Sequence, residues 1–129
     1  MVLILAIHWL QSRAARLQRV VAQTEEQFRL ARQIQQKLFP NGTPRLAGFD
    51  IAGVCYPADA TGGDYFDFIP MSGGGLGVAV GDVSGHGFGP ALLMAEVHAN
   101  IRALALAHID VGEILTLANR MVCEDTADD

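Results

Sequence analysis

Two short segments of the sequence combine glycine with aspartate in a way that suits metal-dependent chemistry. The first is Gly-Gly-Asp-Tyr-Phe-Asp-Phe at residues 62–68, and the second is Gly-Asp-Val-Ser-Gly-His-Gly at residues 81–87. Asp64 and Asp82 each follow a glycine, where the backbone can turn sharply and approach a ligand closely. Carboxylates are the ligands that Mg²⁺ and Mn²⁺ prefer. The alternative is that both aspartates only stabilise turns, as they often do in glycine-rich loops.

The residues around these segments predict strands that would bring the two aspartates together. Residues 65–69 and 76–80 each predict a strand, and a hairpin between them would place both carboxylates at one end of a sheet. Residues 76–80 are apolar throughout, so we expect them to be buried on both faces. Residues 49–56 alternate between apolar and small or polar side chains and predict a third strand.

Helices are expected before and after these strands. Residues 4–39 contain neither glycine nor proline, and Pro40 marks the end of a long helix. A second helix is expected over residues 90–108 and a third over 111–123, with Asp110 as its N-cap. The sequence therefore predicts an α+β fold, with a linker or signalling helix at 1–40 and a globular domain at 41–129.

The long N-terminal helix carries a coiled-coil-like seam. Steps of four and three residues fall mostly on apolar side chains, which favours a homodimer through this helix. The alternative is one amphipathic helix packed on its own domain. The seam comprises Leu10, Ala14, Leu17, Val21, Thr24, Phe28, Ala31, Gln35 and Leu38.

Charge is distributed unevenly along the 129 residues. Up to Arg45 seven basic residues oppose Glu25 and Glu26 (+5), and the remainder has two basic and twelve acidic residues (−10), giving the net charge of −5. An acidic body argues against a nucleic-acid partner. The basic helix could touch a membrane surface, but charges at helical spacing favour a solvated face. Because half of the residues are apolar, we expect one packed domain.

The cysteines and the N-terminal residues bear on the location of the protein. Cys55 and Cys123 form no zinc-binding pattern and suggest no disulfide framework, so a reducing, cytoplasmic location is expected. The first ten residues are apolar apart from His8, too short a stretch to span a bilayer. They fit a buried or self-associating helix start. The alternative is the end of a membrane helix that begins in a missing upstream segment, so that the parent protein is membrane-tethered.

Several motifs in order carry a family resemblance. From about residue 31 to 125 the chain resembles the first half of a PPM-type metal-dependent serine/threonine phosphatase domain, and is similar to the RsbU/SpoIIE-like bacterial regulators of sigma-factor partner switching. The match rests on both glycine–aspartate segments and on Ala-Arg-Gln-Ile-Gln-Gln-Lys-Leu-Phe-Pro (31–40), Tyr-Pro-Ala-Asp (56–59) and Ala-Leu-Leu-Met-Ala (91–95).

The resemblance implies a fold, a metal site and a substrate class. It implies the N-terminal part of an αββα sandwich. It also implies two ions, Mn²⁺ or Mg²⁺, that activate a water: Asp64 binds one, Asp82 bridges both, and the Val83 carbonyl is a further ligand. The implied substrate is a phosphoserine or phosphothreonine of an anti-anti-sigma-type protein.

The chain also departs from the family pattern. The family domain continues to two later aspartates that complete the second metal site, whereas this sequence ends at Asp129, and Asp125, Asp128 and Asp129 lack the matching context. We therefore expect a catalytic domain that is incomplete in this chain. The alternative is a catalytically inactive regulatory or dimerisation fragment.

Other polar residues near the two segments are weaker candidates. Asp67 is three residues after Asp64, so on a strand it points to the opposite face, where it could orient the metal ligands without touching the metal. His86 could donate a proton, or it could simply be solvated in its loop. His98 and His108 are expected to face solvent.

Overall fold

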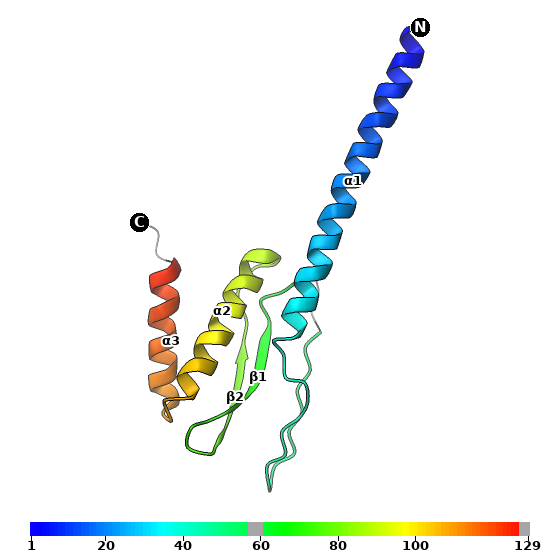
Figure 1. The fold of residues 1–129 in the computed structure, drawn as a ribbon. Helices are drawn as coiled ribbons and strands as arrows, with labels where there is room; N and C mark the ends of the chain where they lie inside the picture. Colours follow the sequence, from blue (N-terminus) through cyan, green and yellow to red (C-terminus); the bar gives the residue numbers. More distant parts are fainter. Residues whose placement is uncertain (57–60, 127–129) are drawn as a thin grey trace.

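The structure is a computed structural model that describes residues 1–56 and 61–126. Within these residues the chain forms three helices and a two-stranded antiparallel sheet: α1 (Val2–Gln36), β1 (Tyr65–Pro70), β2 (Leu76–Gly81), α2 (Phe88–Ala105) and α3 (Val111–Thr126). Figure 1 shows α2 and α3 side by side next to the hairpin, and α1 extending away from it. The α+β class is confirmed, and the complete αββα sandwich stays a prediction.

Helix α1 is the longest element, with 35 residues, and confirms the predicted N-terminal helix. It ends at Gln36, slightly before the predicted end. The N–H groups of Lys37 and Leu38 bond to the carbonyls three residues earlier, at 3.0 and 2.9 Å, which tightens the last turn. Pro40 then prevents continuation, because the residue before a proline avoids the helical conformation. The part of the chain that the structure describes contains no helix long and apolar enough to cross a membrane.

The hairpin of β1 and β2 forms as predicted, with Tyr65 opposite Gly81 and Pro70 opposite Leu76. Gly74, at a φ of 79°, takes a left-handed conformation in the turn that joins the strands. The prediction that the second strand is buried on both faces is wrong: Val78 is 62% and Val80 83% exposed. Helices cover only the other face of the hairpin, so alternate residues of β2 remain open.

The core lies between the hairpin and the two C-terminal helices. Ile69 of β1 packs with Ala105 of α2 and Ile114 of α3. The predicted N-cap of α3 is confirmed, because the carboxylate of Asp110 accepts a hydrogen bond from the Glu113 N–H at 2.8 Å. We call the side of the hairpin that contacts these helices the helix face, and the other side the open face.

The predicted strand over residues 49–56 is wrong. The described part of this segment has only an isolated bridge between Leu46 and Phe49. The segment lies over the open face, where a side chain on Gly53 would collide with the rings of Phe66 and Phe68. Its apolar residues therefore contact side chains of the sheet instead of extending its hydrogen-bonded ladder.

Candidate functional site

Asp64 and Asp82 lie opposite each other at one end of the hairpin. Asp64 directly precedes β1 and Asp82 directly follows β2, and the pairing of Tyr65 with Gly81 puts these aspartates at the next step of the register. The Val83 N–H donates to the Gly63 carbonyl at 3.3 Å, so the pairing continues beyond them. Paired positions alternate in an antiparallel ladder, so one further step beyond Tyr65 and Gly81 would give the two aspartates a non-hydrogen-bonded position.

The backbone beside this pair is tightly packed. Gly63 is buried, and a Cβ atom there would collide with the carbonyl oxygen of Val83. Only glycine allows this approach. Val83 itself is half-buried. The two glycine–aspartate segments are therefore in direct backbone contact.

The loop that follows Asp82 leads directly into α2. Gly85 and Gly87 have φ angles of 100° and 86°, which side chains other than glycine rarely adopt. His86 lies between them and is exposed. The structure thus brings Asp64, Asp82 and Val83 together and places His86 in the adjoining loop, while the roles of all four stay predictions.

The donor type at this end of the hairpin fits a hard cation. Both carboxylates are exposed on the open face, and Asp64 borders a cavity of about 240 Å³ that Tyr56, Phe66 and Val80 also line. In residues 1–56 and 61–126 no group of three or more His, Cys, Asp or Glu side chains could hold a metal. Mg²⁺ commonly binds through one or two carboxylates and keeps several waters, so two opposed carboxylates match it.

Asp67 points to the face of β1 opposite Asp64, as predicted, and its contacts there are structural. It is fully buried on the helix face, where its carboxylate accepts two hydrogen bonds from the Arg102 guanidinium at 2.6 and 2.7 Å and one from the Phe68 N–H at 2.8 Å. Burial raises the pKa of Asp67, but the hydrogen bonds and charge of Arg102 outweigh it, so this pKa lies below its ordinary value. Asp67 joins β1 to α2 and does not face the metal candidates.

None of the three side chains that contact Asp67, namely Arg102, Tyr65 and His98, was identified from the sequence. Tyr65 donates to its carboxylate at 3.3 Å, and His98 Nε2 lies 3.5 Å from it. The expectation that His98 faces solvent is wrong, because its side chain is buried. Burial lowers the pKa of His98; the charge of Asp67 opposes this change and the charge of Arg102 adds to it. One feature of the sequence could have indicated the ion pair: Arg102 is one of only two basic residues after Arg45, so it is a natural partner for a buried carboxylate.

Of the other residues named from the sequence, Cys55 borders the site, and several lie outside the described residues. Residues 57–59 of the Tyr-Pro-Ala-Asp motif, and Asp128 and Asp129, lie outside them. Cys55 borders the same cavity as Asp64, and burial and the charge of Asp64 raise the pKa of its thiol. A thiol with a raised pKa is a poor nucleophile at neutral pH.

Comparisons with known proteins agree with the motifs. The profile of the family Stage II sporulation protein E (SpoIIE) matches residues 72–129, which include Asp82. Phosphoserine phosphatase RsbU of Bacillus subtilis (strain 168) is 26% identical over 106 residues, covering 82% of this chain and 31% of RsbU. The chain thus spans about a third of that relative. No solved structure matches it. The comparisons confirm the resemblance to SpoIIE/RsbU-like phosphatases that the motifs predict.

Proposed function

We propose that this chain is part of a protein serine/threonine phosphatase whose metal site begins at Asp64 and Asp82. The observation that carries the proposal is the register of the hairpin, which sets the two carboxylates opposite each other on an exposed face. The similarity to a protein named phosphoserine phosphatase supports the reaction class. Like charges directly opposite each other destabilise a sheet, so a bound cation would stabilise a site of this kind by offsetting their repulsion.

The chain's own residues have distinct tasks in this proposal. Asp64 and Asp82 hold Mg²⁺ or Mn²⁺, with the Val83 carbonyl as a further ligand. The bound ions supply charge neutralisation at the phosphoryl group and a water of lowered pKa. His86, in the loop after Asp82, is positioned to exchange protons near that end of the hairpin. Gly63 keeps the backbone close to Val83.

The substrate class follows from the resemblance. We propose a phosphoserine or phosphothreonine on a partner protein of the anti-anti-sigma type. Because the described residues hold no group of three or more possible metal ligands, we expect slow turnover by this chain alone.

The direct test is Mn²⁺-dependent phosphate release from a phosphoserine protein such as phosphorylated casein. Asp82→Asn should abolish the Mn²⁺-dependent part, because it removes one of the two carboxylates that would hold the metal. Asp50→Asn, an exposed aspartate before the hairpin, is the matched control and should leave it unchanged. Equal Mn²⁺-dependent release by the unmodified chain and Asp82→Asn would contradict the proposed function.

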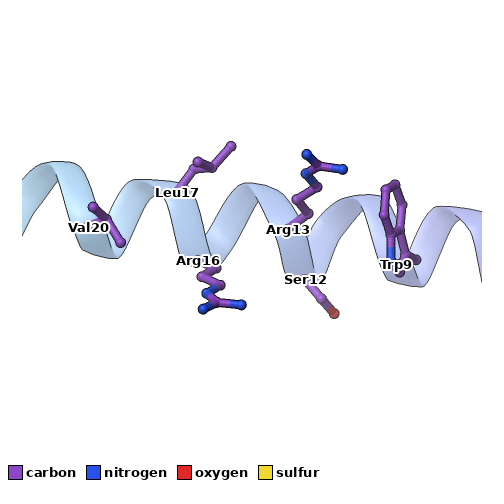
Figure 2. Close-up of a pocket in the computed structure, with 6 residues that line it drawn as sticks. All are labelled: Trp9, Ser12, Arg13, Arg16, Leu17 and Val20. Atoms are coloured by element: carbon purple, nitrogen blue, oxygen red, sulfur yellow. The ribbon is translucent and has the colours of Figure 1, made fainter.

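A second function, homodimerisation through α1, is favoured by the exposed part of its seam. Leu10, Leu17 and Val21 are all more than half exposed on the part of α1 that extends from the body. Figure 2 shows Leu17 on one side of the helix and Ser12 on the other; Arg13 lies over the Trp9 ring at 5.1 Å. The cost of leaving these apolar side chains in water favours pairing with a second copy.

Sedimentation velocity at several concentrations tests the dimer. We expect the unmodified chain to dimerise, Leu17→Glu to be monomeric, and Ser12→Glu to behave as the unmodified chain. A monomer at all concentrations would contradict this function and support the view that α1 is a solvated helix.

A further inference from the structure

The C-terminal part of α1 contacts the first glycine–aspartate segment and the start of the helix that follows the second. The side-chain amide of Gln35 bonds twice to the backbone of one residue: its Nε2 donates to the Gly62 carbonyl at 2.6 Å, and its Oε1 accepts from the Gly62 N–H at 3.2 Å. Gln35 is only 7% exposed although most of α1 is open to solvent. Gly62 lies two residues before Asp64.

The second contact comes from the same side of α1. Phe28 stacks on Phe88, with ring centroids 4.4 Å apart and an angle of 16° between the rings. Phe88 is the first residue of α2, six residues after Asp82. Because Phe28 and Gln35 are seven residues apart, they lie two turns apart on one face of α1. One face of one helix therefore contacts the first glycine–aspartate segment and the residue that directly follows the second.

A short chain of contacts leads from Gln35 to the aspartate pair. Gln35 bonds to the backbone of Gly62, and Gly63 is the next residue. The Gly63 carbonyl accepts a hydrogen bond from the Val83 N–H. Asp64 and Asp82 lie between this bond and the first pair of the hairpin. Gln35 bonds to Gly62 and not to either aspartate, so any effect of Gln35 on Asp64 and Asp82 passes through the Gly63–Val83 contact.

We propose that Gln35 is a positioning residue that keeps the Gly62–Gly63 turn against Val83 and so sets the separation of Asp64 and Asp82. Its consequence for metal binding rests on the proposed function, but the positioning itself does not. Loss of the side-chain amide would leave the backbone N–H and carbonyl of Gly62 without these two partners and loosen the turn. Asp64 would then move freely relative to Asp82.

The test compares amide hydrogen exchange of Val83 with that of Asp67 and Ala79, which pair in the middle of the hairpin. Gln35→Met keeps the length of the side chain and removes both bonds. It should speed exchange at Val83 about tenfold, the factor expected from one to two net hydrogen bonds, and leave the middle of the hairpin unchanged. The control Gln36→Met, at the exposed neighbouring position, should change neither.

A second variant separates positioning from a general loss of stability. Gln35→Glu keeps an acceptor for the Gly62 N–H but sets a second carboxylate oxygen against the Gly62 carbonyl in a buried position, so exchange at Val83 should speed up at least as much as in Gln35→Met. Unchanged exchange at Val83 in both variants would overturn the inference. Equal acceleration of Val83, Asp67 and Ala79 would overturn it too, because Gln35 would then support the whole fold.

Mn²⁺ titration then connects the inference with the proposed function. Gln35→Met should weaken Mn²⁺ binding about tenfold, as expected when a group that orients a metal ligand is lost. Undiminished Mn²⁺ affinity would contradict the effect of Gln35 on the metal site. If the unmodified chain does not bind Mn²⁺, the proposed function fails, whereas the exchange rates still decide the role of Gln35.

Discussion

The aspartates on the two faces of the hairpin have opposite environments. On the helix face, Asp67 is fully buried and is neutralised by two hydrogen bonds from Arg102. On the open face, Asp64 and Asp82 are exposed and oppose each other across the two chains. The alternation of side chains along a strand produces this separation, because residues 64 and 67 must point to opposite faces.

The difference separates a structural carboxylate from two candidate ligands. A buried carboxylate is tolerated only when it is paired and hydrogen-bonded, and Arg102 and the Phe68 N–H meet this requirement for Asp67. Two opposed carboxylates in water remain accessible to a cation. Proximity in sequence is thus a poor guide to function in this segment, and the face of the strand is a better one.

The largest expected effect tests the helix face. Arg102→Met should lower the free energy of unfolding by about 3 kcal/mol, because it leaves a buried carboxylate without its charged partner. This loss of stability is at the low end of the range for buried ion pairs because the Arg102 guanidinium is partly exposed. Urea unfolding measures the change. The control Arg120→Met, an exposed basic residue on α3, should stay within about 0.5 kcal/mol. A similarly small effect of Arg102→Met would show that Asp67 does not need its partner.

The next effect tests the open face. Mn²⁺ at about 100 times its dissociation constant should stabilise the unmodified chain by about 2.7 kcal/mol, since it binds only the folded state. Asp82→Asn should lose this gain, and in EDTA it should be more stable by about 0.5 kcal/mol because the repulsion from Asp64 is removed. Thermal unfolding with Mn²⁺ and with EDTA checks both values. An equal response of Asp82→Asn and the unmodified chain to Mn²⁺ would argue against a cation between these carboxylates.

A glycine substitution tests the backbone contact that joins the two segments. Gly63→Ala should destabilise the chain by about 2 kcal/mol, since its Cβ would collide with the Val83 carbonyl oxygen and the backbone must shift. A Cβ at Gly75 would meet no atom within 4 Å, so Gly75→Ala is the matched control. Thermal unfolding of both variants is the measurement. Equal stabilities would mean that the two segments are not in close contact.

The sequence predicted the elements better than their surroundings. Periodicity and the absence of glycine and proline predicted α1, and the two apolar runs around three consecutive glycines predicted the hairpin that places Asp64 near Asp82. These features are local. The pairing of Asp67 with Arg102 joins residues 35 apart, and the exposure of Val80 depends on how many layers cover the sheet. Neither is determined by neighbouring residues.

The smallest expected effect concerns pH and again separates the two faces. The pKa of buried His98 is below its ordinary value of 6.5 in the folded chain, so the unfolded chain binds more protons as the pH falls below about 6.5. Stability should therefore be full above that pH and decline as the pH falls toward the pKa of the folded state. The lowered pKa of Asp67 acts in the same direction at more acidic pH, below its ordinary value of 3.8.

His98→Gln should remove the decline just below pH 6.5, whereas His8→Gln, on the exposed part of α1, should keep it. Urea unfolding from pH 7.5 to 5 measures this slope, and an unchanged slope in His98→Gln would show that the buried network on the helix face does not control it.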